Sequence, residues 1–228
     1  MATLARGEWG GWHYTVTKLL PMVVLTVTAA LFTVTVPSGG SSGTKARCWC
    51  AVGGILWSTL GDWLLAARSV SEDRFLLGTI CFAIAHILNV YSFEQFSNLS
   101  SNSPWILRIT VGVTLLQTTI MWLTLSHISY LALKLTVVAY SFVLSITFGL
   151  TILHHMFVPT AGSFCRFLGY LSFVISDSII VLDAYTVAIP KSQLWILITY
   201  YMAESLIFVG ILLDTRSNRF NTKIMKTS

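Results

Sequence analysis

Four carboxylates lie inside apolar stretches of the sequence, and no basic residue of the same stretch can neutralise them. They are Asp62, Asp177, Asp183 and Glu204. An aspartate at the centre of a bilayer costs about 2.5–3.5 kcal/mol on insertion scales, so intramembrane acids are usually retained for function. Two carboxyl groups in different surroundings can serve as a general acid and as an electrostatic stabiliser or base. The carboxylates therefore predict proton-transfer chemistry within the membrane.

The structural alternative for Asp62 and Asp177 is a hydrogen bond that holds two helices together. Serine, threonine or asparagine would make such a bond at lower cost, and we therefore favour the functional interpretation. Asp183 follows Asp177 by six residues and lies near the end of its stretch. An interfacial role and a functional role are both open for Asp183.

Other polar residues in apolar stretches fit the same chemistry. A single histidine such as His86 is commonly a hydrogen-bonded packing residue, but an imidazole beside buried carboxylates is suited to proton transfer. Tyr200 and Tyr201 precede Glu204 by one helical turn, which places phenols and a carboxylate on one stripe. Lys18 either extends to the membrane interface or holds a phosphate as a point charge.

Metal chemistry receives little support from the residue types. Catalytic zinc sites generally use two or three histidines, whereas the central part of the chain offers His86. His154 and His155 are adjacent, so they point in different directions on a helix. The four cysteines lack the spacing of a zinc ribbon or of a disulfide framework. We expect neither a metal nor another cofactor.

Membrane-spanning helices are the elements that must position these residues. Of the 228 residues, 55% are hydrophobic and 10% are charged, whereas soluble domains carry about 25% charged residues. A hydrocarbon core about 30 Å thick needs about 20 helical residues, and seven stretches are long enough. They are Thr15–Val36, Ala46–Ala67, Phe75–Phe96, Pro104–Ser126, Tyr130–His155, Gly162–Ala188 and Ser192–Asp214. The sequence predicts an all-α, polytopic transmembrane bundle of about seven spans.

Short connections predict one transmembrane domain, residues 1–214, followed by a basic tail, residues 215–228. The basic residues form no stripe that would bind nucleic acid, and their distribution instead predicts topology. One side of the membrane collects Lys45, Arg47, Arg108, Arg166, Arg216, Arg219, Lys223 and Lys226, and the other collects Arg6, Arg68, Arg74 and Lys191. We therefore expect a cytosolic C-terminus in a protein whose main partner is the lipid bilayer. Whether it forms a homo-oligomer is left open.

Five short motifs follow one another in a characteristic order: Lys18-Leu19-Leu20-Pro21, Gly61-Asp62, Phe82 through Ala85-His86, Ser176-Asp177, and Tyr200-Tyr201 with Ala203. This order resembles the lysoplasmalogenase family of multispan membrane proteins, also called YhhN-like, from Thr17 to about Ile211. The resemblance implies hydrolysis of the vinyl ether bond of choline or ethanolamine lysoplasmalogens, which releases a fatty aldehyde and a glycerophospho-alcohol. It also implies the endoplasmic reticulum membrane, where the animal members of the family reside.

The chain departs from the family pattern in three places. Family members resemble eight-span proteins with a helix ahead of the Lys-Pro region, and Met1–Tyr14 is too short and polar to supply that helix. Glu204 stands where family members carry Gln, and Asn89 stands where they tend to have Tyr. We expect these differences to affect the polarity of the pocket.

Vinyl ether hydrolysis begins with protonation of the β-carbon, and water then captures the resulting oxocarbenium ion as a hemiacetal. We predict that Asp62 and Asp177 supply the acid and the stabiliser or base, in either order, while His86 orients or relays a proton. Glu204 and the two tyrosines would position water, and Lys18 would attract the phosphate. The predicted substrate-binding set is Lys18, Ser58, Tyr140, Ser176, Tyr200, Tyr201 and Glu204.

A proton-coupled transporter or channel is the competing class, because buried acids and a histidine also suit a proton relay. The small size of the chain and the lack of a two-half repeat argue against a carrier. A seven-helix receptor is a third interpretation, but the sequence lacks Asp-Arg-Tyr and Asn-Pro-x-x-Tyr signatures. Hydrolysis of a lysophospholipid remains our expectation.

Overall fold

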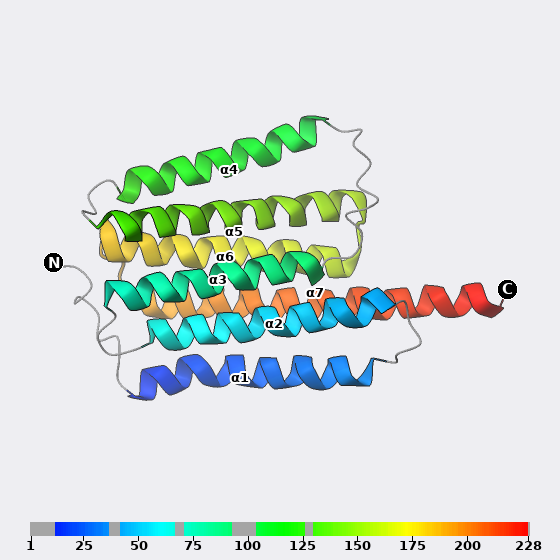
Figure 1. Cartoon of the computed structure of the whole chain (residues 1–228). Coiled ribbons are helices and arrows are strands. Elements are labelled where there is room, and N and C mark those ends of the chain that lie inside the picture. Colours follow the sequence, from blue (N-terminus) through cyan, green and yellow to red (C-terminus); the bar gives the residue numbers. More distant parts are fainter. Residues whose placement is uncertain (1–11, 37–41, 67–70, 93–103, 126–129, 228) are drawn as a thin grey trace.

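The computed structural model describes residues 12–36, 42–66, 71–92, 104–125 and 130–227, and these residues form a bundle of α-helices without strands (Figure 1). The helices are α1 (Trp12–Thr35), α2 (Ser42–Leu65), α3 (Glu72–Ser92), α4 (Pro104–Thr124), α5 (Leu131–Phe157), α6 (Ala161–Tyr185) and α7 (Ser192–Thr227). The prediction of an all-α polytopic bundle is therefore confirmed. Met1–Gly11, Pro37–Ser41 and Arg68 lie outside the described residues.

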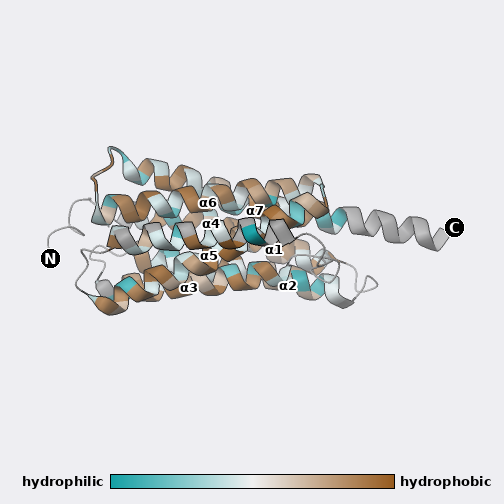
Figure 2. Cartoon of the chain, turned by 90° about the horizontal axis from the view of Figure 1, so that it is seen from above, coloured by the Kyte–Doolittle hydropathy of each residue, from teal (hydrophilic) through white to brown (hydrophobic). Residues whose placement is uncertain are grey.

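Six helices of the described part are long and apolar enough to cross a membrane, namely α1, α2, α3, α5, α6 and α7. Hydrophobic residues occur along the length of the bundle (Figure 2). Many large apolar side chains face outward, including Leu20, Leu31 and Val34 of α1. Exposed apolar surface on this scale is stable in lipid rather than in water. The chain is a multi-pass membrane protein.

Helix α6 and helix α7 form a closely packed hairpin because small residues line their contact. A Cβ atom at Gly169 would lie 2.9 Å from the carbonyl oxygen of Ala203. A Cβ atom at Gly210 would lie 2.6 Å from the carbonyl oxygen of Gly162. Small residues let two transmembrane backbones approach, so that van der Waals contacts replace the missing hydrophobic driving force. This hairpin carries Asp177 and Glu204.

The ends of these two helices follow local sequence signals. Thr160 caps α6 in a capping box, since its hydroxyl accepts the Ser163 N–H at 3.0 Å and the Ser163 hydroxyl accepts the Thr160 N–H at 3.0 Å. Lys191, which precedes α7, has a φ of 57°, in the left-handed region that helps reverse the chain. Helix α7 continues past Asp214 to Thr227, so the residues expected to form a tail are helical there (Figure 1).

Candidate active site

Asp62 is buried between three helices and has two partners. The Lys18 Nζ atom lies 3.0 Å from Asp62 Oδ1, and the Tyr200 hydroxyl donates a hydrogen bond of 2.6 Å to Asp62 Oδ2. Asp62 is 1% exposed and Lys18 is 5% exposed. The ion pair joins α1 to α2, and the Tyr200 phenol links α7 to the same carboxylate. Lys18 therefore does not extend to the membrane interface, one of the two roles that the sequence left open.

Pro21 explains how α1 is fixed beside this ion pair. A proline lacks the N–H that would bond the carbonyl four residues earlier, and within a membrane that carbonyl needs another partner. The single proton of the Tyr201 hydroxyl is shared between the Thr17 carbonyl oxygen at 3.1 Å and the Lys18 carbonyl oxygen at 3.0 Å. Tyr201 thus holds the backbone of α1, while its neighbour Tyr200 bonds Asp62.

Asp177 ends a hydrogen-bonded chain of three side chains. The Tyr140 hydroxyl donates to Asp177 Oδ2, and the same hydroxyl oxygen lies 3.2 Å from His86 Nε2. A phenol has one proton to donate, so the Nε2 atom of His86 must be the donor toward Tyr140. The chain links α6, α5 and α3. It also assigns the His86 tautomer with the proton on Nε2.

Aromatic rings hold the imidazole of His86 in place. The Phe173 ring packs edge-on at a centroid distance of 4.7 Å, and the Tyr170 ring lies 5.7 Å away. His86 is itself fully buried among these rings. A ring confined on several sides keeps one orientation, so the packing fixes the position of both imidazole nitrogens.

A third carboxylate, Glu204, lies in the same region without a hydrogen bond to either oxygen among the described residues. Glu204 is 2% exposed. The Ser58 hydroxyl interacts electrostatically with the Glu204 carboxyl, but the two groups do not meet the geometric criteria of a hydrogen bond. Buried polar atoms in folded proteins are nearly always bonded, so a water or a polar substrate group would find partners here.

Asn89 extends this polar region along α3. Its Oδ1 atom also has no hydrogen-bond partner in the described part of the chain, and neither does the Nδ1 atom of His86. A Cβ at Gly54 would lie 2.5 Å from Asn89 Oδ1, so α2 and α3 are in close contact at this level. Ser58 follows Gly54 by one helical turn, and His86 precedes Asn89 by one turn. The antiparallel register therefore brings Ser58 and His86 to one depth.

Electrostatic interactions connect these groups into one cluster. The Glu204 carboxyl interacts with both Asp62 and Asp177, and Lys18 acts on Asp177 as well as on Asp62. The structure thus brings together eight of the predicted residues, which we call the carboxylate cluster. Its members are Lys18, Ser58, Asp62, His86, Tyr140, Asp177, Tyr200 and Glu204.

Three other polar residues considered from the sequence serve local structure. The Ser176 hydroxyl donates to the Ile196 carbonyl oxygen at 3.3 Å, which joins α6 to α7. Asp183 Oδ1 accepts the Ile189 N–H at 2.8 Å and so orders the chain that follows α6. Tyr201 bonds the backbone of α1, as described above. The interfacial role left open for Asp183 is the one that its contacts support.

Histidine and acidic side chains do not gather at a metal centre in the described residues. No group of three or more His, Cys, Asp and Glu side chains there is placed to hold a metal ion. His155 Nδ1 lies 2.9 Å from the Ser163 hydroxyl, and His154 Nδ1 lies 3.4 Å from Arg166 Nη2. The two adjacent histidines therefore have separate polar partners.

Sequence reasoning missed one member of this region. Tyr170 is fully buried, lies beside the Asn89 amide and interacts with Glu204. Tyr170 precedes Asp177 by seven residues, which is about two helical turns and therefore the same face of α6. That spacing is the signal that could have identified it.

The fold and the carboxylate cluster define the class: a multi-pass helical membrane protein with acidic residues from several helices gathered in its interior. The chain belongs to the YhhN family, whose model matches residues 13–211. This range includes every member of the carboxylate cluster. The family resemblance predicted from the five motifs is confirmed.

Individual relatives are similar along most of the chain. This chain is 27% identical over 201 residues to lysoplasmalogenase TMEM86B of Sus scrofa, and the aligned region covers 88% of this chain and 76% of that protein. The Homo sapiens protein of the same name is 27% identical over 202 residues, with the same two coverages. The Mus musculus protein is 26% identical over 202 residues, again with coverages of 88% and 76%. No solved structure matches the chain.

Proposed function

We propose that this protein is a membrane-embedded hydrolase that cleaves the vinyl ether bond of lysoplasmalogens with choline or ethanolamine headgroups. The observation that carries the proposal is that Asp62 and Asp177 belong to one cluster but differ in burial and in their partners. Asp62 is buried and bonded by both an ammonium and a phenol, whereas Asp177 is partly buried and bonded by a phenol. Two acids in unlike surroundings are what an oxocarbenium reaction requires. The names of the TMEM86B relatives support the same substrate class.

We assign the acid role to Asp177 and the stabilising role to Asp62. The Lys18 ammonium favours the anionic form of Asp62, which is then suited to stabilise a cation. Both acids accept a hydrogen bond from a phenol, which favours the anion, but the Lys18 ammonium lies 3.0 Å from Asp62. Asp177 therefore takes up a proton more readily than Asp62 and is the better proton donor. The Asp177 proton moves to the β-carbon of the vinyl ether, and positive charge develops on the α-carbon and the ether oxygen.

Water completes the reaction. We assign its position to the region of Glu204, Ser58 and Asn89, whose polar atoms have hydrogen-bonding capacity left. The water oxygen bonds to the α-carbon and gives a hemiacetal, and one water proton returns to the cluster through His86 and Tyr140 to restore Asp177. Collapse of the hemiacetal transfers the second proton to the leaving oxygen. The products are a fatty aldehyde and a glycerophospho-alcohol, so atoms and charges balance.

The family and the lipid substrate also suggest a setting. We propose the endoplasmic reticulum membrane as the location, with the C-terminus in the cytosol. Apolar side chains enclose the cluster, among them Phe82, Phe173 and Ile207, and keep the proposed site in an apolar environment. A single-chain lipid could then place its ether bond at the carboxylates while its chain stays in an apolar environment.

Aspartate-to-asparagine variants test the proposal. Asp62→Asn and Asp177→Asn keep side-chain volume but remove the charge or the proton, so each should lower aldehyde release by about 10²–10⁴-fold. The assay uses purified protein in detergent micelles with choline and ethanolamine lysoplasmalogens. Asp183→Asn is the matched control on α6, because Asp183 bonds a backbone N–H outside the cluster. Normal aldehyde release by both cluster variants would refute the catalytic assignment.

The same residues support proton-coupled transport as a second candidate. The observation in its favour is the hydrogen-bonded chain His86–Tyr140–Asp177, which could pass a proton between helices. Proteoliposomes separate the two functions, since a hydrolase releases aldehyde without needing a proton gradient. Substrate-dependent proton uptake without aldehyde would favour the carrier.

A further inference from the structure

A row of buried polar side chains leads from the carboxylate cluster toward the end of the bundle where α2 and α6 begin. We call this row the polar seam, and its members are Ser92 and Asn89 of α3 and Arg166 and Tyr170 of α6, each at most 5% exposed. Asn89 follows His86 by one helical turn. Tyr170 interacts with both Glu204 and Arg166. The polar seam is therefore continuous with the cluster at its inner end.

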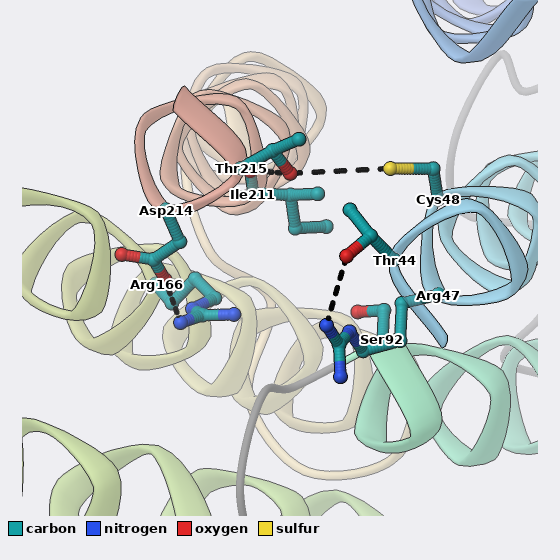
Figure 3. Close-up of a pocket in the computed structure, with 8 residues that line it drawn as sticks. All are labelled: Thr44, Arg47, Cys48, Ser92, Arg166, Ile211, Asp214 and Thr215. Carbon is teal, nitrogen blue, oxygen red and sulfur yellow. Dashed lines mark hydrogen bonds and ion pairs between the residues drawn. The ribbon is translucent and has the colours of Figure 1, made fainter. Parts of the chain in front are cut away.

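A small pocket lies at the outer end of the polar seam (Figure 3). Ser92 and Arg166 line this pocket together with residues of α2 and α7. Arg166 is held in place, because its guanidinium bonds Asp214, and Asp214 also accepts the Thr160 hydroxyl at 3.0 Å. The pocket has room for about one water molecule. It is therefore suited to admit water to the seam.

The inner end of the polar seam consists mainly of hydrogen-bond acceptors that lack a donor. Among the described residues, Asn89 Oδ1, His86 Nδ1 and both carboxyl oxygens of Glu204 have no hydrogen-bond partner. Because the His86 proton lies on Nε2, the Nδ1 atom can only accept. Buried polar atoms without a protein partner are usually bonded by ordered water, which supplies two protons. These acceptors therefore match a short chain of waters.

The polar seam is short enough for such a chain. Six residues of α3 separate His86 from Ser92, or about 9 Å along the helix axis. Hydrogen-bonded oxygens lie about 2.8 Å apart, so about three waters span that distance. Asn89 stands halfway, and Tyr170 lies beside its amide. These two side chains therefore divide the route into two steps of one helical turn each.

The opposite end of the bundle is closed beside Asp177 by an apolar cluster. Its buried members include Phe75, Leu125, Leu133 and Val181. Val181 follows Asp177 by one turn of α6, so the apolar cluster lies directly beyond the carboxyl group. A water that crossed it would give up its hydrogen bonds, at a cost that a polar route avoids. The polar seam is the more favourable way for water to reach this part of the protein.

We propose that Asn89 and Tyr170 bind a chain of waters that carries water and protons from the pocket to the carboxylate cluster. Water enters beside Ser92, is held at this pair of side chains and reaches the Glu204 carboxyl. Each hydrolysis consumes one water, and the next water from the pocket replaces it. The supply of hydrolytic water rests on the proposed function, whereas proton exchange with solvent through the same waters does not.

Asn89→Leu and Tyr170→Phe test the route in purified protein in detergent micelles. Each variant keeps the size of the side chain but removes a hydrogen-bonding group, so kcat for aldehyde release should fall about tenfold while KM for the lysoplasmalogen stays the same. Asn89→Ser should lose less activity than Asn89→Leu, because it offers a hydroxyl and space for a further water. A purely structural role would make the serine variant at least as defective, since it leaves the larger cavity.

Infrared spectra recorded after transfer to D₂O give a second readout that needs no substrate. The C=O band of a protonated carboxyl shifts when deuterium replaces its proton, and this shift should be about tenfold slower in Asn89→Leu and Tyr170→Phe. Thr79→Val is the matched control on α3, because the Thr79 hydroxyl bonds the Phe75 carbonyl oxygen at 2.8 Å, outside the polar seam. The control should exchange at the wild-type rate.

The two readouts separate this proposal from the hydrolase assignment. If the wild-type protein releases no aldehyde, the hydrolase assignment fails, and the rate of deuterium exchange alone decides on the route. Wild-type exchange rates in both seam variants, or an equal slowing in Thr79→Val, would overturn the route even where hydrolysis is observed.

Discussion

At the scale of single residues, Lys18 supplies Asp62 with a counter-charge from another helix. Lys18→Met would leave the Asp62 carboxylate buried, with the Tyr200 phenol as its hydrogen-bond partner among the described residues. Removing one member of a buried ion pair typically costs 3–5 kcal/mol, so we expect unfolding in detergent to shift by about that amount. The double variant Lys18→Met/Asp62→Asn should regain most of the loss. An unchanged unfolding midpoint in Lys18→Met would contradict the observed pairing.

Tyr140 is the link between His86 and Asp177, and its hydroxyl can be removed without changing the ring. Tyr140→Phe should lower aldehyde release by about 10²-fold, because proton return to Asp177 loses its bridge. The expected change in Tm is small by comparison. Tyr130→Phe is the matched control, since Tyr130 lies at the start of the same helix and is 37% exposed. Equal activities of the two variants would remove Tyr140 from the mechanism.

The residues of the carboxylate cluster could be predicted to a large extent, but their pairing could not. Asp62, Asp177 and Glu204 are conspicuous because a charge in an apolar stretch is rare whatever its neighbours are. The Lys18–Asp62 ion pair depends on how α1 lies against α2, and no local signal in the sequence specifies that packing. The role of Tyr201 was equally unpredictable from the sequence. Pro21 leaves the Thr17 carbonyl oxygen without a backbone N–H partner, and Tyr201 of another helix bonds that oxygen.

At the scale of helices, the contact between α6 and α7 depends on the absence of side chains. Gly210→Ala would place a Cβ 2.6 Å from the Gly162 carbonyl oxygen, so the helices must separate. We expect a loss of about 1–3 kcal/mol in unfolding free energy, as for other overpacked interfaces. Gly112→Ala on α4 is the control, because its Cβ would meet nothing within 4 Å. If both variants unfold alike, the close packing is unimportant.

Helix positions were predictable because hydropathy and length together specify a span. All seven predicted stretches overlap the observed helices, and the differences lie at the ends. The predicted last span ends at Asp214, where hydrophobicity ends, whereas α7 continues because residues 215–227 contain neither proline nor glycine. The lateral arrangement of the helices was not predictable, since every lipid-facing surface has a similar apolar composition.

At the scale of the whole molecule, the distribution of Lys and Arg predicts the orientation in the membrane. An epitope fused to the C-terminus should be digested by protease added to sealed microsomes, and one fused to the N-terminus should be protected. The measurement is immunodetection before and after detergent is added. A protected C-terminal epitope would reverse the predicted topology.

Helix α1 meets lipid along most of its outer surface, with Leu20, Leu31 and Val34 each at least 60% exposed. The same helix delivers the ammonium that balances Asp62. Membrane thickness and acyl composition act first on such a peripheral helix, because mismatch is relieved by tilt. A tilt of α1 would move the Lys18 ammonium away from the Asp62 carboxylate. The thickness of the surrounding bilayer would then change how readily the acids at the centre of the protein take up protons.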